Sequence, residues 1–174
     1  MHILRPGLTL AILAAPALAQ TTPAPDDLVN TARAEMASPD GTGIGTLTLT
    51  STPVGAIVSG TLRGLLPGPH GIHVHETGAC EPPFESAGGH FDPAGAEHGF
   101  LSEGGPHAGD MTNVTVGEDG LVAVEILDTF LTLDRTLFDE DGAAMVIHAG
   151  PDDYRTQPSG HSGDRIACGI ILPD

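Results

Sequence analysis

Two histidines separated by a single residue are the first feature of this sequence that could do chemistry. His73 and His75 lie in the segment Gly71–Glu76, whose apolar residues alternate as in a β-strand. Residues two apart on a strand point from the same face, so both imidazoles are available to one ion while Ile72 and Val74 point from the other face. A single His-x-His pair is weak evidence for a metal, because two structural histidines would give the same pattern.

Further ligand types follow in a loop rich in glycine and proline. His90, His98, His107 and Asp110 lie in this loop, which has few apolar residues of its own. Three imidazoles and a carboxylate match a four-coordinate zinc site. A bound ion would also explain how a loop without a core keeps one shape. The alternative is a solvated polar loop with scattered histidines.

One more histidine ends an apolar run. His148 follows Ala144–Ile147, where a buried imidazole without a partner would be costly. It is therefore either a ligand or a core histidine that hydrogen-bonds to the backbone.

Short alternating segments must position these side chains. No stretch has a convincing helical period with caps, whereas apolar alternation with Thr, Ser and Gly dominates. The residues Leu47 and Leu49 should point inward, with Thr46, Thr48 and Thr50 outward. We therefore expect an all-β sandwich or flattened eight-stranded barrel, with strands at Ala32–Ala37, Gly45–Thr50, Ala56–Leu62, Gly71–Glu76, Met111–Val116, Leu121–Leu127, Ala143–Ala149 and Arg165–Leu172.

Turns and loops divide these strands. Asp40-Gly41 and Glu118–Gly120 are tight-turn signals. Two long irregular segments, Thr77–Asp110 and Gly150–Asp164, interrupt the regular pattern. Loops of this length in a compact domain are usually functional or disordered, and the ligand-type residues favour function.

The N-terminus has the features of a secretory signal. A short start that contains Arg5 precedes the apolar run Leu8–Leu18 and a small-residue cleavage site near Ala19. We expect a signal peptide at residues 1–19, a flexible lead-in at 20–30 and one domain at 31–174. The signal predicts export to the periplasm, with secretion as second choice. No later segment is apolar enough for a membrane span.

Charge and cysteine content bear on partners and on redox state. The net charge is -17, and all six basic residues are arginine. Such a surface disfavours nucleic acid and anionic membranes. Export would take the two cysteines, Cys80 and Cys168, into an oxidising compartment, so a disulfide is the expected state and a free thiol or thiolate ligand the alternative.

Several blocks together resemble the Cu,Zn superoxide dismutase family, in its bacterial periplasmic branch. They occur in order between about Ala32 and Ile171, and the list is Gly71–Glu76, Ser86–Pro93, His98-Gly99, His107–Asp110 and Gly163–Gly169. The resemblance implies a Greek-key antiparallel sandwich, an architecture in which this enzyme is a known example.

The resemblance also implies two metal ions per subunit, one copper and one zinc. Copper would be held by His73, His75, His90 and His148. Zinc would be held by His90, His98, His107 and Asp110. An imidazolate has a lone pair on each ring nitrogen, so His90 could bridge both ions.

Other residues take their roles from the same resemblance. Arg165 would guide the anion and His90 would supply a proton, so both are candidate catalytic residues. Asp152 would link a copper histidine to a zinc histidine, with Asp153 as the alternative by one position. Cys80 and Cys168 would form the family's disulfide. His70 and His161 have no ligand role and are expected to face solvent.

The expected activity is dismutation of superoxide to dioxygen and hydrogen peroxide by a copper redox cycle, with structural zinc. The rivals are a non-catalytic exported copper or zinc carrier and a partner-binding sandwich with vestigial sites. Superoxide is the expected partner, without nucleic acid or membrane, and the chain is expected to be a monomer or a homodimer.

Overall fold

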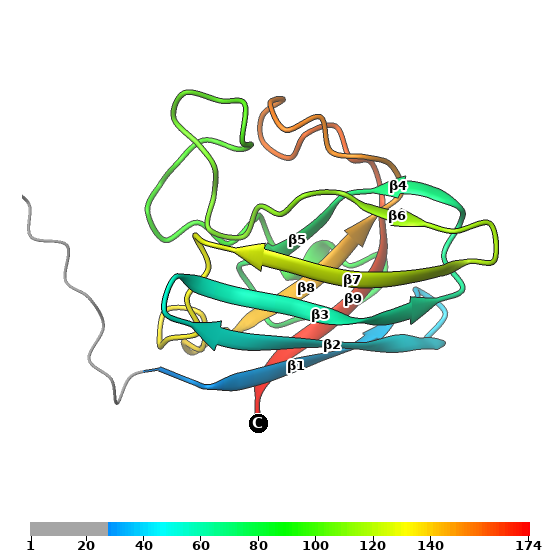
Figure 1. Ribbon diagram of the computed structural model, residues 1–174, viewed down its shortest axis with the longest axis horizontal. Coiled ribbons are helices and arrows are strands. Elements are labelled where there is room, and N and C mark those ends of the chain that lie inside the picture. Colours follow the sequence, from blue (N-terminus) through cyan, green and yellow to red (C-terminus); the bar gives the residue numbers. More distant parts are fainter. Residues whose placement is uncertain (1–27) are drawn as a thin grey trace, which may run out of the picture.

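β-strands make up nearly all regular structure in residues 28–174, which are the part of the chain that the computed structural model describes (Figure 1). The expected signal peptide and most of the lead-in lie outside the described residues. Within residues 28–174, no helix is long and apolar enough to cross a membrane. In order, the elements are β1 (Thr31–Ala37), β2 (Gly43–Thr52), β3 (Gly55–Arg63), β4 (Gly68–His70), β5 (Ile72–His75), the short 3-10 helix η2 (Glu85–Ala87), β6 (Val114–Val116), β7 (Leu121–Asp128), β8 (Ala143–His148) and β9 (Arg165–Pro173).

All eight expected strands have a counterpart, and the all-β prediction is confirmed. Two details of the prediction were wrong. The expected strand Met111–Val116 is reduced to β6, and the short strand β4 was not predicted, because Gly68-Pro69 reads as a loop.

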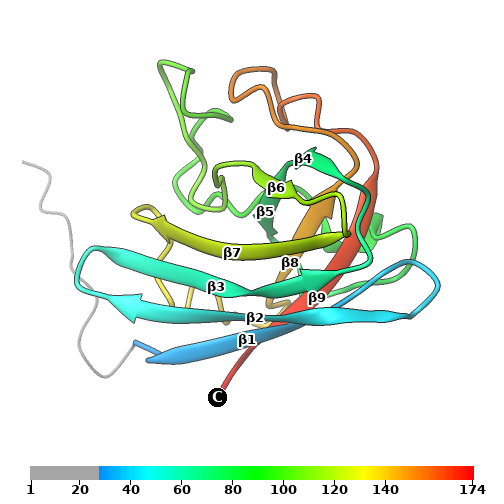
Figure 2. The ribbon, with the colours of Figure 1, turned by 45° about the vertical axis from the view of Figure 1, so that its right-hand side comes forward.

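Seven strands form one antiparallel sheet in the order β5-β8-β9-β1-β2-β3-β7, and β4 pairs with β6 in a second, two-stranded sheet. The pairings β3–β7 and β5–β8 join strands that are distant in sequence, as expected for Greek-key connections. The long sheet curls so that β8 and β9 lie behind β2 and β3 (Figures 1 and 2). The apolar core fills the space that the curl encloses.

Alternation along the strands explains this core. Leu47 and Leu49 of β2 are fully buried, while Thr46 and Thr48 are half-buried and Thr50 is exposed, as the sequence predicts. Each buried leucine removes most of its apolar surface from water, which contributes about 1.5–3 kcal/mol per side chain.

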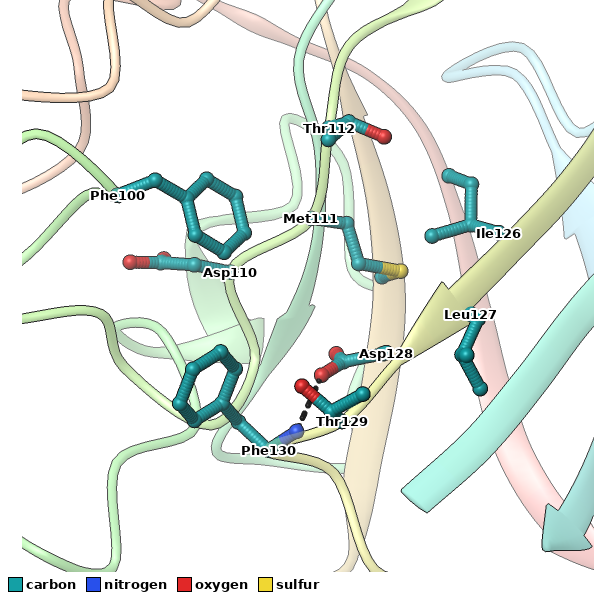
Figure 3. Close-up of a pocket in the computed structure, with 9 residues that line it drawn as sticks. All are labelled: Phe100, Asp110, Met111, Thr112, Ile126, Leu127, Asp128, Thr129 and Phe130. Carbon is teal, nitrogen blue, oxygen red and sulfur yellow. Dashed lines mark hydrogen bonds between the residues drawn. The ribbon is translucent and has the colours of Figure 1, made fainter. Parts of the chain in front are cut away.

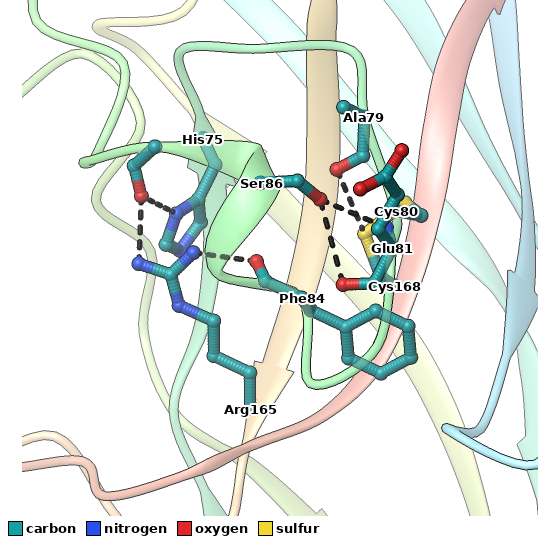
Figure 4. Close-up of a disulfide and its surroundings, with 9 residues drawn as sticks. His75, Ala79, Cys80, Glu81, Phe84, Ser86, Arg165 and Cys168 are labelled. Atoms are coloured by element: carbon teal, nitrogen blue, oxygen red, sulfur yellow. Dashed lines mark hydrogen bonds between the residues drawn. A yellow bond between two sulfur atoms is a disulfide. The ribbon is translucent and has the colours of Figure 1, made fainter.

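β8 is buried along both of its faces. Met145 and Ile147 pack in the main core, whereas Ala144 and Val146 face the other way into a smaller apolar cluster with Phe84. The chain that covers this outer face is fastened there by the disulfide between Cys80 and Cys168, which the sequence predicted (Figure 4). The outer face of the sheet at β8 is therefore covered by a loop and is not exposed to water.

Two segments without strands provide that cover and the rest of the site. We call residues 76–113, between β5 and β6, the long loop, and residues 149–164, between β8 and β9, the closing loop. They correspond to the two irregular regions predicted from the sequence. The long loop begins beside the start of β8 and the closing loop begins at the other end of β8, but parts of both lie together above the sheet (Figure 2).

Candidate metal centre

Three histidines lie on the outer face of the sheet. His73 and His75 of β5 are opposite Val146 and Ala144 of β8, and those two residues belong to the outer apolar cluster. His148 has the same parity as these two residues along β8. The strand geometry therefore gathers the three imidazoles on one face while Ile72 and Val74 remain in the core.

Backbone hydrogen bonds then bring the long loop alongside β5. The N–H of Val74 donates to the carbonyl of Gly109 at 2.9 Å, and the N–H of Phe91 donates to the carbonyl of Val74 at 2.8 Å. As a result His90 lies beside His75 and Asp110 lies beside His73, as isolated bridges of the sheet. The hydrogen bonds along the free edge of β5 thus determine which loop residues lie next to His73 and His75.

The first group so formed is the four-histidine cluster, consisting of His73, His75, His90 and His148. All four are buried, and one potential ligand atom from each lies within 4.8 Å of the others. Each ring has one buried nitrogen with no hydrogen-bond partner: Nδ1 of His73 and Nε2 of His75, His90 and His148. Buried polar atoms are nearly always paired, so four convergent unpaired nitrogens fit a site where all four bind one cation.

The second nitrogen of each strand histidine is held by a neighbour. Nδ1 of His75 lies 3.0 Å from the carbonyl of Gly88, and Nδ1 of His148 lies 3.1 Å from the carbonyl of Gly163. Such a partner fixes which ring nitrogen carries the proton and leaves the other free to bind a metal.

The second group is the Asp110 cluster, consisting of His90, His98, His107 and Asp110. Oδ1 of Asp110 lies 2.7 Å from Nδ1 of His90 and 3.0 Å from Nδ1 of His98. Oδ2 accepts N–H groups from Gly99 and His107. Because His90 belongs to both clusters, its two ring nitrogens face two sites. Three imidazoles and one carboxylate are a donor set that suits zinc.

The electrostatics of the four-histidine cluster favour neutral rings. Burial lowers the pKa of His75 to about 2, of His73 to about 3 and of His148 to about 4. The pKa of His90 is also lowered, mainly by burial. At neutral pH these imidazoles are uncharged, so their free nitrogens have lone pairs for a cation.

The Asp110 cluster has the opposite character. Burial disfavours the charged form of His98, but hydrogen bonds to Asp110 and Asp152 outweigh burial and raise its pKa to about 9. Burial likewise opposes the ionised form of Asp110, yet hydrogen bonds from His90 and His98 hold its pKa well below the usual range. This cluster therefore contains a fixed negative charge.

Asp152 connects the two clusters. Its Oδ2 lies 2.7 Å from Nε2 of His73, and its Oδ1 lies 3.1 Å from Nε2 of His98. The neighbouring Asp153 is exposed and caps a local turn at Thr156. Of the two adjacent aspartates, only Asp152 is in contact with both sites.

Arg165 lies beside the four-histidine cluster, in the lining of a cavity that we call the entrance. Its Nη1 donates to the carbonyl of Phe84 at 2.7 Å, and its Nη2 donates to the carbonyl of Gly88 at 2.6 Å (Figure 4). It lines a cavity of about 800 Å³ together with Gly163 and the acidic residues Glu85 and Asp164. The guanidinium group of Arg165 thus lines this cavity together with two acidic side chains.

The expectation for His70 was wrong, whereas that for His161 is confirmed. His161 is exposed. His70 is only 3% exposed, with its Nδ1 2.7 Å from the carbonyl of His148 and its Nε2 2.8 Å from the carbonyl of Leu66. It supports the backbone of a cluster residue. The available signal was parity, because His70 is in phase with the core residues Ile72 and Val74.

A further buried acidic side chain lines a cavity together with Asp110. Asp128, at the end of β7, lines a cavity of about 110 Å³ with Asp110, Phe100 and Phe130 (Figure 3). Its Oδ1 accepts the N–H of Phe130 at 2.8 Å, and its buried Oδ2 has no hydrogen-bond partner. Burial raises the pKa of Asp128 to about 6.

Comparison with known proteins agrees with this geometry. The sequence profile of the copper/zinc superoxide dismutase (SODC) family matches residues 43–171. Superoxide dismutase [Cu-Zn] 2 of Aquifex aeolicus (strain VF5) is 46% identical, over 80% of this chain and 85% of that protein. A SOD-like protein from Bacillus subtilis has a solved structure that is 40% identical, with a TM-score of 0.77 over 80% of this chain and 97% of that one. The Cu/Zn superoxide dismutase from Brucella abortus is 30% identical, with a TM-score of 0.68 over 81% of this chain and 99% of that one. The chain described here belongs to the copper/zinc superoxide dismutase family.

Proposed function

We propose that the four-histidine cluster holds copper and the Asp110 cluster holds zinc, with one ion of each kind per subunit. The chain converts superoxide into dioxygen and hydrogen peroxide, the reaction of its family. The observation that carries the assignment is the convergence of four buried imidazole nitrogens without partners. An all-imidazole set suits copper, and a set of three imidazoles and one carboxylate suits zinc.

When bound, copper supplies a one-electron redox couple, and zinc supplies a fixed charge that orders the long loop. The chain's own residues perform the remaining work. The guanidinium of Arg165 attracts the superoxide anion into the cavity and holds it near the histidines. His90 would take up a proton from water on its Nε2 and pass it to the peroxide product, and water would supply the second proton.

Hydrogen-bond partners that lie outside the two clusters hold the histidine rings in place. Asp152 directs the rings of His73 and His98 through its two oxygens. The carbonyls of Gly88 and Gly163 do the same for His75 and His148. In metal sites such partners fix ring orientation and raise ligand basicity.

A non-catalytic exported metal carrier is the main rival. Storage requires ligands but no anion-binding group, whereas Arg165 is anchored by two backbone carbonyls at the entrance. This argues for turnover of an anion.

Processing and assembly belong to the same proposal. Residues 1–19 are a signal peptide, residues 20–30 a lead-in and residues 31–174 the dismutase domain, which acts in the periplasm as a monomer or homodimer. The bacterial relatives and the disulfide between Cys80 and Cys168 are consistent with export.

The test is the metal content of the chain that begins at residue 20, measured together with superoxide-dependent dye reduction before and after chelation and copper return. We expect one copper and one zinc per chain, with activity that follows copper. His148→Ala should abolish activity, and His161→Ala, at an exposed histidine, should retain it. Bound metal without turnover would support the carrier instead.

A further inference from the structure

Two side-chain amides link the long loop and the closing loop, and each reaches from its own loop to the backbone of the other. Asn113, at the end of the long loop, donates from Nδ2 to the carbonyl of Asp152 at 2.9 Å and accepts the N–H of Asp152 on Oδ1 at 2.8 Å. Gln157, in the closing loop, donates from Nε2 to the carbonyl of His98 at 2.9 Å and accepts the N–H of His98 on Oε1 at 2.9 Å. Each loop thus grips the backbone of one residue in the other.

The chemistry of the carboxamide explains the choice of residue type. Among side chains, only Asn and Gln present a donor and an acceptor side by side in one plane, as a peptide group does. Each amide therefore satisfies both backbone groups of its target, as a neighbouring strand would. These four bonds replace a sheet ladder between two segments that contain no strand.

The two gripped residues face each other. Oδ1 of Asp152 lies 3.1 Å from Nε2 of His98. Gly160 closes over this contact, since any side chain there would overlap the carboxylate of Asp152 and crowd His98. The contact between the aspartate and the histidine is therefore confined by Gly160 on one side and by the two backbone clamps on the other.

Tyr154 reinforces the Asn113 clamp, and the contact between Asp152 and His98 links this clamp to that of Gln157. Its hydroxyl oxygen accepts the N–H of Asn113 at 2.7 Å, and its own N–H donates to Oδ1 of Asp152 at 2.6 Å. Asn113 is half-buried, and Gln157 is exposed. The exposed member can thus be replaced without opening the core.

We propose that Asn113 and Gln157 are positioning residues that act as a reciprocal clamp, holding Asp152 and His98 in register so that the Asp110 cluster binds zinc tightly. This inference rests on the proposed zinc site. It adds a contribution from the closing loop, which supplies none of that cluster's ligands.

The experiment compares Gln157→Ala, Asn113→Ala and the double variant in the chain that begins at residue 20. Zinc affinity is measured by competition with a chelator, and backbone amide exchange of His98 and Asp152 is measured by NMR on the metal-free protein. We expect each single variant to weaken zinc binding about tenfold, as loss of an outer partner does, and to speed exchange at both amides. The double variant should be little weaker than either single one, because contacts within one unit are not additive.

Two further variants separate positioning from general loosening of the loop. Gln157→Glu keeps the oxygen that accepts the His98 N–H, so it should recover part of the lost zinc affinity. Thr156→Ala removes a hydrogen bond to Asp153 within the closing loop alone, and should leave zinc affinity unchanged. Equal weakening by Thr156→Ala would overturn the clamp.

The proposal also fails if exchange rises only at the amide directly bonded to the replaced residue, or if zinc affinity stays within twofold. Failure of the proposed zinc site would look different, since the unaltered chain would then not bind zinc at all, and failure of the proposed activity would appear as bound metal without turnover. The exchange measurement needs no metal, so it tests the loop contact in either case.

Discussion

Arg165 and His75 share one hydrogen-bond acceptor. The carbonyl oxygen of Gly88 lies 2.6 Å from Nη2 of Arg165 and 3.0 Å from Nδ1 of His75 (Figure 4). The guanidinium proposed to guide the anion and a ring of the four-histidine cluster are thus held by the same carbonyl oxygen. Their separation depends on one backbone segment, which the disulfide holds against β9.

Arg165→Ala should leave copper binding intact and lower kcat/KM at low salt by at least about tenfold, because a local positive focus raises the rate of anion encounter. The measurement is kcat/KM for superoxide at several salt concentrations. Arg33→Ala, which removes the same charge from β1, is the matched control and should have a small effect. An unchanged rate in Arg165→Ala would remove the guiding role.

Glu85→Gln should raise kcat/KM at low salt about twofold, since Glu85 lines the entrance beside Arg165 and repels an anion. The gain should disappear near 1 M salt, where the screening length is about 3 Å. Glu118→Gln, in an exposed turn before β7, is the matched control. A gain of the same size in both variants would mean that net charge matters and the position of Glu85 does not.

Zinc affinity should increase with pH between about 6 and 8. The pKa of His98 is raised to about 9 in the metal-free protein, so a proton must leave this ring when it becomes a ligand. We expect release of about one proton from His98 per zinc bound at pH 7, which calorimetry in buffers of different ionisation enthalpy can measure. An affinity that is flat over this range would contradict the assignment of His98 as a ligand.

Asp128→Asn should flatten part of the pH dependence of stability. A carboxyl group whose folded pKa is raised to about 6 contributes stability that is complete below about pH 4 and is lost as pH rises through 6. Asparagine keeps the oxygen that accepts the N–H of Phe130 and removes the buried charge. Between pH 4 and 7 the free energy of unfolding should therefore shift in favour of the variant, by at most about 3 kcal/mol.

Urea denaturation of the metal-free protein at several pH values measures this shift. Asp134→Asn, at a half-buried position in a surface turn, controls for the loss of a charge. A constant difference between the Asp128 variant and the unaltered chain from pH 4 to 7 would show that Asp128 ionises normally.

Loss of the disulfide should affect both stability and the entrance. Replacing Cys80 and Cys168 with serine should lower the free energy of unfolding by about 2–5 kcal/mol. It should also slow turnover, because the carbonyls of Phe84 and Gly88 that hold Arg165 lie in the fastened segment. Combined with Arg165→Ala, the serine variant should add little to the loss of rate. Unchanged rate and metal retention would show that the long loop holds its shape without the bond.

Much of the site could be predicted from the sequence because ligand chemistry is local. A His-x-His pair on a strand fixes the direction of His73 and His75, and the loop ligands carry their own residue-type signature. Which distant segments contact each other cannot be read from residue types in the same way. Nothing near Gln157 in the sequence indicates that its amide meets the backbone of His98.

Two misses have specific causes. His70 was taken as exposed because histidine is polar and follows Pro69, although both of its ring nitrogens lie near backbone carbonyls inside the protein. β4 was missed because a three-residue strand with glycine and proline has no readable alternation, and it exists only through its pairing with β6.

The position of the clusters on the outer face of β5 and β8 has a consequence for assembly. The main core is built on the opposite face from Met145, Ile147 and their neighbours, with no contribution from the ligands. We therefore expect that the sheet can form before any ion binds, and that metal binding mainly orders the covering loops. Metal supply, and not folding of the sheet, would then determine when the protein becomes active.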